Sequence, residues 1–192
     1  MDVLRFRVAG ADDADSVATL HAQSWRRHYR GAYADAFLDG DVEAERLLVW
    51  TRRLSRRDPA ALTVVAETNG AIAGFAHTVL DQDPTWGALL DNLHVTMGHQ
   101  RQGIGTHLMV RSARFVLSRR RGSGLYLWVL EQNVPAQHFY ARMGGEPVEA
   151  SPVPDVGGVP GRLNGEPIGL RYAWRDPNVL VARALAGCPH SR

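Results

Sequence analysis

A glycine-rich turn is the part of the chain whose residue types most directly suggest chemistry. Residues 89–105 read LLDNLHVTMGHQRQGIG, an apolar segment that runs into Gln100-Arg101-Gln102-Gly103-Ile104-Gly105. Glycine lets a phosphate group approach the backbone closely, and the first amides of a helix have no acceptor within that helix. The turn therefore predicts a site where backbone amides bind a pyrophosphate group. A tight turn with purely structural glycines is the alternative.

A second segment whose residue types could take part in a reaction lies at residues 133–144, which read NVPAQHFYARMG. Asn133 is a good helix N-cap, because its side chain can accept a hydrogen bond from the first turn. Tyr140 carries a hydroxyl that can donate a proton. Phe139 and Met143 are typical of core packing, and a buried, hydrogen-bonded tyrosine is the alternative for Tyr140.

In this order, the two segments resemble those of the GNAT superfamily of acetyl-CoA-dependent N-acetyltransferases. The first matches the superfamily pattern (Arg/Gln)-x-x-Gly-x-(Gly/Ala) at Gln100, Gly103 and Gly105. The resemblance implies transfer of an acetyl group from acetyl-CoA to a primary amine, by direct attack in a ternary complex. It also implies an α/β (α+β) fold. Helices flank a mixed, mostly antiparallel central sheet, whose fourth and fifth strands splay apart around the cofactor.

The same resemblance implies which residues bind the cofactor and which one donates a proton. The backbones of Leu93 and Val95 would contact the pantetheine arm, and Tyr140 holds the position that protonates the departing thiolate. The implied cofactor-binding residues are Leu93, His94, Val95, Gln100, Arg101, Gln102, Gly103, Ile104, Gly105, Thr106, Asn133, Phe139 and Tyr140.

A proton acceptor for the amine is harder to place, because the glutamate that many superfamily members carry on the fourth or fifth strand is missing. Asp91 is the catalytic candidate on the fourth strand, with a solvated or hydrogen-bonded carboxylate as the alternative. Alternation along a strand predicts that Asn92 and His94 face the opposite side. The ordinary pKa of histidine would suit His94 as a base, although a structural role is the alternative. A base acting through water would leave no mark in the sequence.

An aromatic pair at Trp25 and Tyr29 resembles one branch of the superfamily and predicts a substrate-binding wall. In that fold, the first two helices and the Gly/Pro-rich loop at residues 154–167 border the acceptor pocket. Aromatic rings would attract a cationic amine. Core packing of two aromatic residues four positions apart is the alternative.

Composition narrows the function classes. The net charge of +2 is too small to require a nucleic acid partner, and the 22 residues counted as lysine or arginine are all arginine, which excludes a lysine base. Cys188 is the single cysteine, so there is no internal disulfide, and no metal site is expected. A signal peptide and a membrane span are absent, which predicts a cytoplasmic protein. A non-catalytic CoA-binding sensor or scaffold, and an acetyltransferase for an RNA-linked amine, remain alternatives.

The elements that position these residues follow from periodicity and turn signals. We expect one domain over residues 1–175 and a tail over 176–192. That tail would pack on the domain or on a second subunit, so a homodimer stays open. Asn69-Gly70 predicts a hairpin turn, and Gly74 a bulge. Strands are expected at 4–8, 62–67, 71–80, 88–95, 125–130, 146–153 and 168–174, and helices beginning near residues 12, 41, 104 and 133.

Overall fold

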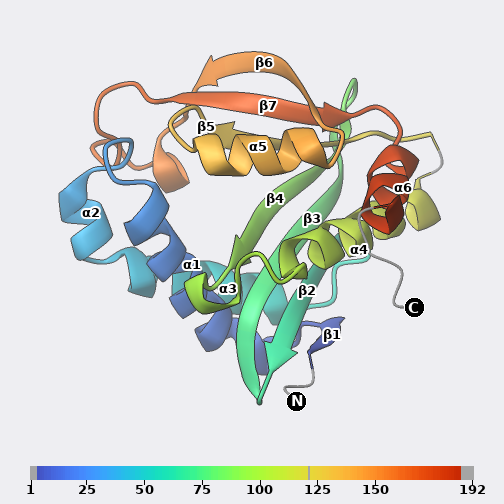
Figure 1. Ribbon diagram of the computed structural model, residues 1–192. Helices are drawn as coiled ribbons and strands as arrows, with labels where there is room; N and C mark the ends of the chain where they lie inside the picture. Colours follow the sequence, from blue (N-terminus) through green and yellow to red (C-terminus); the bar gives the residue numbers. More distant parts are fainter. Residues whose placement is uncertain (1–3, 121, 187–192) are drawn as a thin grey trace.

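The computed structural model describes residues 4–120 and 122–186, so Cys188 lies outside the described part. Its centre is a seven-stranded sheet with the order β1-β2-β3-β4-β5-β7-β6 (Figure 1). Neighbouring strands are antiparallel except for β4 and β5. The strands are β1 (Arg5–Val8), β2 (Ala61–Thr68), β3 (Ala71–Asp83), β4 (Gly87–Val95), β5 (Leu125–Leu130), β6 (Glu146–Pro152) and β7 (Ile168–Trp174).

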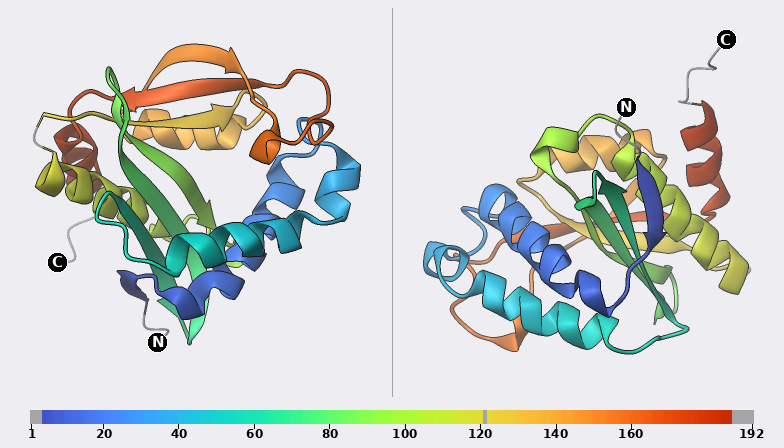
Figure 2. Two further views of the ribbon diagram at one scale, coloured as in Figure 1. Left: turned by 180° about the vertical axis from the view of Figure 1, so that it is seen from behind. Right: turned by 90° about the horizontal axis from the view of Figure 1, so that it is seen from below.

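Helices cover both faces of this sheet, with α1 and α3 on one side and α4 on the other (Figure 2). None of the described helices is long and apolar enough to cross a membrane. The α-helices are α1 (Ala14–His28), α2 (Asp35–Asp39), α3 (Val42–Leu54), α4 (Ile104–Arg119), α5 (Val134–Arg142) and α6 (Asn178–Ala186). Short 3-10 turns are η1 (Ala11–Asp13), η2 (Met97–His99) and η3 (Val156–Gly158).

Alternation along β2 sends consecutive side chains into two separate cores. Val64 packs into the cluster that contains Leu108 of α4, whereas Val65 packs into the cluster that contains Trp50 of α3. Full burial of one such apolar side chain stabilises the fold by about 1.5–3 kcal/mol. Both helical layers thus pack against this one strand.

The structure adds several features to the expected elements. The short helix α2 was not expected, because five residues carry too little periodic signal. Strand β7 lies between β5 and β6 and pairs with both. Residues 178–186 of the expected tail form α6, which packs against α4 with Leu180 fully buried. The hairpin turn at Asn69 and Gly70 is confirmed, with φ of 51° and 77°.

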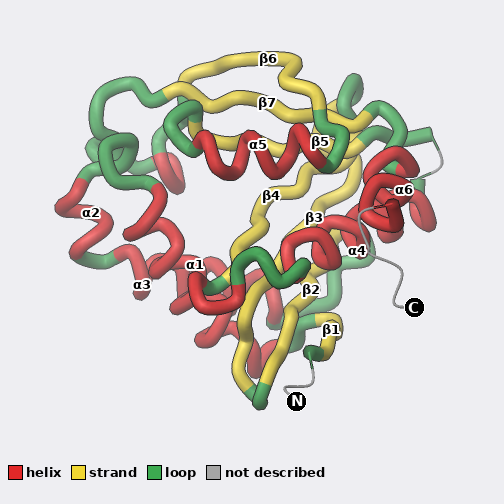
Figure 3. Tube along the Cα trace, viewed as in Figure 1, coloured by secondary structure: helices red, strands yellow, loops and turns green. Residues whose placement is uncertain are grey.

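The separation of β4 from β5 is the feature of the fold that creates a site. The two strands pair only at Ala88 with Leu125 and at Leu89 with Tyr126. Beyond these pairs, β4 continues alongside β3, and β5 continues alongside β7 (Figure 3). The predicted mixed, mostly antiparallel sheet with a splay between its fourth and fifth strands is confirmed.

Two irregularities shape β4 and its neighbour. In the pairing of β3 with β4, His77 lies opposite Asn92, but the next residue, Thr78, lies opposite Leu90. Asp91 is therefore an extra residue in β4 without a partner in β3. A bulge of this kind re-aims side chains. The β2–β3 register also shifts beside Gly74, where an added Cβ would lie 2.9 Å from the carbonyl oxygen of His94. Glycine thus allows the close approach of β3 and β4 next to the site.

Candidate active site

A cleft of about 770 Å³ opens where β4 and β5 separate. Its walls come from β4, the turn after it, β5, one side of α5 and the end of α1. The residues that line it, and that define the cleft below, are Ser24, His28, Tyr29, Leu90, Asp91, Asn92, Leu93, His94, Val95, His99, Gln100, Arg101, Gly103, Gly105, Thr106, Leu127, Trp128, Val129, Asn133, Pro135, Ala136, Phe139, Tyr140 and Arg142.

The glycine-rich turn, residues 100–105, presents backbone amides at one end of this cleft. Arg101 and Gly103 both adopt positive φ, 61° and 83°. The first intrahelical bond of α4 runs from the amide of His107 to the carbonyl of Gly103. Within the described ranges, the amides of residues 101–103 donate to no backbone oxygen, and the next three precede the first helical bond. Such a concave run of free amides is typical of a phosphate-binding loop.

Eleven of the thirteen predicted cofactor residues line the cleft, all except Gln102 and Ile104. The Gln102 side chain is turned to the carbonyl of Gly98, to which its Nε2 donates at 3.1 Å. The Ile104 side chain is buried in the core beneath the turn, because it is the first apolar residue on the inner face of α4. Neither side chain faces the cleft, and only the backbone of these two residues contributes to the turn.

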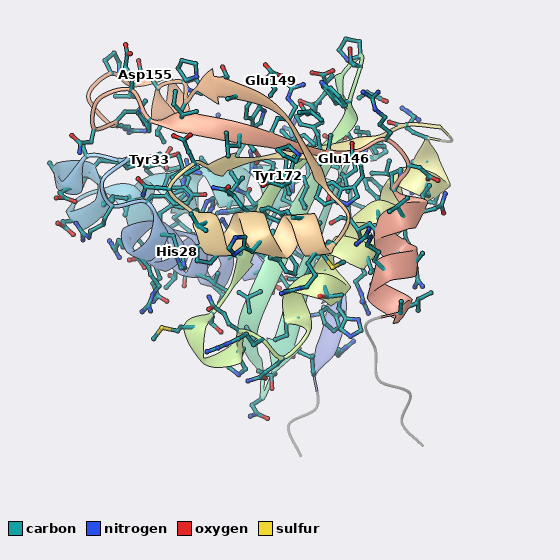
Figure 4. All side chains as sticks on the ribbon, turned by 45° about the horizontal axis from the view of Figure 1, so that its top comes forward. His28, Tyr33, Glu146, Glu149, Asp155 and Tyr172 are labelled. Carbon is teal, nitrogen blue, oxygen red and sulfur yellow. The ribbon has the colours of Figure 1, made fainter. Side chains whose placement is uncertain are left out.

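Tyr140 lies on the inner side of α5, where its side chain is largely buried and lines the cleft. The rings of Phe139 and Tyr172 lie 5.4 and 6.0 Å from the Tyr140 ring. Tyr172 belongs to β7 and is labelled in Figure 4. No hydrogen bond to its hydroxyl exists among residues 4–120 and 122–186. Burial, with a smaller contribution from Tyr29, raises the pKa of Tyr140 well above its ordinary value. The phenol is therefore protonated over the physiological pH range.

Asn133 caps α5, as its residue type predicts. Its Oδ1 accepts a hydrogen bond from the amide of Ala136 at 3.4 Å, while the residue also lines the cleft. The preceding Gln132 donates from Nε2 to the carbonyl of Arg30 at 2.7 Å. This bond joins the start of α5 to the end of α1. Figure 4 shows His28 at this junction.

The bulge in β4 changes the expected arrangement around Asp91. Asp91 Oδ2 and Asn92 Oδ1 lie 2.7 and 3.0 Å from the same Arg53 Nη1 atom. The prediction that these two neighbours face opposite sides was wrong, because the extra residue in the bulge breaks the alternation. Arg53 reaches them from α3, and Asp91 keeps 30% of its side chain exposed on the cleft.

His94 faces the cleft but belongs to a buried polar cluster beneath it. Its Nδ1 lies 2.7 Å from the hydroxyl of Ser24, and its ring lies 4.7 Å from that of His21. His21 in turn accepts a hydrogen bond from Trp50 Nε1 at 3.0 Å. The pKa of His94 is lowered to about 3, mainly by burial. The charges of His28 and Arg46 also lower this pKa, and the charge of Asp91 opposes them in part. His94 is consequently a neutral imidazole near pH 7.

The predicted aromatic wall is divided between the cleft and the core. Tyr29 lines the cleft, and burial together with Asp91 raises its pKa to about 12. Trp25 is buried behind it, stacked at 5.5 Å on Tyr29 and covered by the guanidinium of Arg46 at 4.3 Å. Trp25 therefore supports Tyr29 and does not line the cleft, contrary to the prediction that both form a wall.

Sequence reasoning did not single out several residues of the cleft. Ser24 and His28 reach it from α1, and Trp128 and Arg142 reach it from β5 and α5. Their spacing within each element carries no sign of the tertiary contact that assembles them. No group of three metal-ligating side chains occurs within residues 4–120 and 122–186.

The family to which the chain belongs is shown by comparison with known proteins. The model of the acetyltransferase (GNAT) family matches residues 22–145, which contain the glycine-rich turn, the splayed strands and α5. The chain belongs to this family. Membership makes it an acyltransferase with acetyl-CoA as its cosubstrate, in agreement with the prediction from the two segments.

Individual relatives agree with this assignment. An uncharacterized N-acetyltransferase YuaI of Bacillus subtilis (strain 168) is 27% identical over 144 residues, 74% of this chain and 80% of its own. The streptothricin acetyltransferase of Streptomyces lavendulae is 39% identical over 85 residues, 42% of either chain. The PaiA N-acetyltransferase of Thermoplasma acidophilum, solved with coenzyme A, shares the fold. Its TM-score is 0.62 at 16% identity, covering 90% of this chain and 99% of that one.

Proposed function

We propose that the protein acetylates a primary amine by direct attack on acetyl-CoA, with both reactants bound in the cleft. The observation that carries this proposal is the shared position of two groups. One cleft brings together the free amides of residues 101–106 and the side chain of the largely buried Tyr140. Binding of a pyrophosphate at one end would place the rest of a CoA molecule along β4, toward the tyrosine.

The exposed edge of β4 supports this placement of the cofactor. Beyond Leu89, β4 pairs with β3 on one side, and within the described residues it has no strand partner on the other. Backbone groups on such an edge can hydrogen-bond an extended amide-containing chain, as a neighbouring strand would. The pantetheine arm contains such amides, and we place it against Leu93 and Val95.

The proposed reaction conserves atoms and protons. The amine nitrogen forms a bond to the acetyl carbonyl carbon, and the carbon–sulfur bond breaks, so sulfur leaves with the bonding electrons. Tyr140 gives its hydroxyl proton to that sulfur, and the proton lost by the amine passes to Asp91, directly or through water. Exchange with solvent then restores both groups. No covalent intermediate with the protein is needed.

Asp91 suits the role of proton acceptor better than His94. The depressed pKa of His94 makes its imidazole a weak base, and its Nδ1 is already bonded to Ser24. Asp91 has one carboxylate oxygen on Arg53 and remains partly exposed on the cleft. Its negative charge also lies close enough to raise the pKa of Tyr29. A cationic amine bound there would meet a carboxylate and an aromatic ring together.

The acceptor we propose is a small-molecule or peptide amine, and streptothricin is the first one to test. The likeness to a streptothricin acetyltransferase supports this choice, together with the carboxylate and the ring of Tyr29 on the cleft. We also propose that residues 1–175 with α6 act as a single catalytic domain in the cytoplasm.

The test is release of free thiol from acetyl-CoA in the presence of an amine panel that contains streptothricin, amino acids and peptide N-termini. Release that depends on one amine class, with the acetylated amine found by mass spectrometry, would support the proposal. Tight acetyl-CoA binding without turnover on any amine would instead favour a sensor or scaffold. Steeply salt-dependent RNA binding would favour an RNA-linked amine.

A further inference from the structure

A second, smaller pocket of about 400 Å³ lies beside the cleft, between α1 and the turn that follows β4. We call it the side pocket. One wall is the exposed face of the second half of α1, and the other is the segment from the end of β4 to the glycine-rich turn. Its lining residues are Leu20, Gln23, Ser24, Arg26, Arg27, His28, Val95, Thr96, Met97 and Gln100.

The side pocket opens into the cleft. Ser24, His28, Val95 and Gln100 line both spaces. Gln100 is also the first residue of the glycine-rich turn, so the pocket begins where a bound pyrophosphate would lie. A molecule whose reacting end occupies the cleft can thus extend a second group into the side pocket.

The charged side chains that line the side pocket are all positive. Its lining includes Arg26 and Arg27 but no aspartate or glutamate. The cleft differs, because Asp91 lines it. The side pocket therefore favours a group of negative charge and disfavours an additional ammonium group.

The two arginines of the side pocket have different partners. Arg26 is held within the fold, since its Nε donates to the carbonyl of Leu38 at 2.8 Å and its Nη1 lies 3.2 Å from Glu43. Arg30, further along, pairs with Asp35 and Asp39. Arg27 has no carboxylate partner within residues 4–120 and 122–186, and its guanidinium reaches across to the sulfur of Met97. A thioether is a weak acceptor, so Arg27 keeps its capacity to bind an anion.

The guanidinium of Arg27 also affects the protonation of His28. Burial and the positive charge of Arg27 lower the pKa of His28, so its ring is neutral near pH 7. The end of α1 that carries both residues is fixed to the start of α5 through Gln132. The side pocket thus has a rigid wall, a planar cation without a carboxylate partner in the described part of the chain, and a neutral imidazole that can donate a hydrogen bond.

We propose that the side pocket binds an anionic oxygen group of a reactant held in the cleft, with Arg27 as its principal ligand. An arginine fork matches the geometry of phosphate and carboxylate oxygens. Two sources supply this chemistry: the 3′-phosphate of the cofactor, and a carboxylate on the acceptor. Only the second source rests on the function proposed above.

Binding of two cofactor forms tests the first source without any acceptor. The dissociation constants of CoA and dephospho-CoA are measured by calorimetry for the native protein, Arg27→Gln and Arg56→Gln. Arg56 is an exposed arginine after α3 and serves as a charge-matched control. A 3′-phosphate in the side pocket predicts that Arg27→Gln weakens CoA about tenfold and leaves dephospho-CoA unchanged, the size expected for one charge-assisted contact. Arg56→Gln should change neither constant.

Acceptor kinetics test the second source. Thiol release is measured for amines that carry a carboxylate and for the corresponding carboxamides, in the same three proteins. A carboxylate in the side pocket predicts that Arg27→Gln raises KM about tenfold for the acids alone, while both CoA constants stay unchanged. Arg27→Lys, which keeps the charge and loses the fork, should recover part of this discrimination.

The proposal is overturned if Arg27→Gln alters neither the preference for CoA over dephospho-CoA nor the preference for acids over carboxamides. It is also overturned if the cofactor preference is unchanged and the native protein turns over no carboxylate-bearing amine. Absence of all turnover combined with an Arg27-dependent CoA preference would refute the proposed function and keep the anion site.

Discussion

Asp91 and Arg53 form an ion pair on the wall of the cleft, with 2.7 Å between Oδ2 and Nη1. The pair joins α3 to the bulge in β4, and Arg53 also bonds Asn92 at 3.0 Å. The carboxylate is thereby aimed by a residue from another element. Its second oxygen is left for a reactant, and this arrangement underlies our choice of Asp91 as proton acceptor.

Replacement of Asp91 tests that choice. We expect Asp91→Asn to lower kcat by roughly 100-fold or more, the usual size of general-base catalysis, with little change in acetyl-CoA affinity. His94→Gln is the matched control and should lower kcat by less than about tenfold, since it removes a group that is a weak base. A larger loss in His94→Gln than in Asp91→Asn would assign the proton to the imidazole. Steady-state kinetics and calorimetric binding provide both readouts.

Arg53→Gln separates positioning from proton transfer. Without its partner, the Asp91 carboxylate loses its orientation but keeps its ability to take a proton. We expect a smaller fall in kcat than in Asp91→Asn, measured by steady-state kinetics. The double variant should be no slower than Asp91→Asn alone, because the two residues act as one unit. Additive losses in the double variant would contradict this coupling.

The two aromatic residues near the cleft should respond differently to substitution. Tyr29→Phe keeps the ring and removes only the hydroxyl, whereas Tyr29→Ala removes the wall and should raise the KM of a cationic amine several-fold. Trp25→Ala should instead destabilise the fold by about 3–5 kcal/mol, as expected for a buried aromatic residue. Trp25→Phe should leave the acceptor KM within about twofold of native. A selective rise in acceptor KM for Trp25→Phe would restore Trp25 to the substrate wall.

Gly103 should be required for its backbone conformation. Its φ of 83° is costly for a residue with a Cβ, although the nearest atom to an added Cβ is 3.9 Å away, so space is not the limit. Gly103→Ala should lower the free energy of unfolding by about 1–2 kcal/mol and weaken acetyl-CoA binding. Gly103→Asn should show a smaller loss of stability and of acetyl-CoA affinity, because asparagine tolerates this conformation better than alanine. Equal losses in the two variants would point to a steric effect.

Acid should destabilise the fold through its buried histidines. Burial lowers the pKa of His94 to about 3 and of His77 to about 4, from a usual value near 6.5. Between the folded and unfolded pKa values the unfolded chain binds more protons, so stability is present above about pH 6.5 and is lost below it. We expect a loss of about 2 kcal/mol for each histidine from about pH 7 to pH 5. Urea unfolding at both pH values measures this, and His77→Gln should reduce the pH dependence.

Most of the elements and the conformation of the glycine-rich turn could be predicted from the sequence, because both rest on local signals. Glycines with positive φ, a helix start and an asparagine cap are visible in a few consecutive residues, and they lie where expected. The separation of β4 from β5 came from the resemblance to a family. Neither strand alone shows where its neighbour departs.

The acceptor end was less predictable, because it depends on tertiary contacts. The register shift at Asp91 cannot be read from strand alternation, since DNLHV contains no glycine or proline to mark a bulge. Trp25 and Tyr29 have similar local patterns, yet Arg46 from α3 covers one and not the other. Ser24 reaches the site only because α1 lies against the end of β4.

Acetyl-CoA turnover with a responsive amine, measured for the native protein, Tyr140→Phe and Tyr33→Phe, tests whether Tyr140 donates the proton. Tyr33 is also buried with a raised pKa, but it packs against Tyr29 outside the cleft lining. We predict that Tyr140→Phe lowers kcat about 100-fold with an unchanged dissociation constant for acetyl-CoA, while Tyr33→Phe stays near native. Native kcat in Tyr140→Phe would contradict the proton-donor role and would mean that the cleft is not an acid-assisted acetyltransferase site.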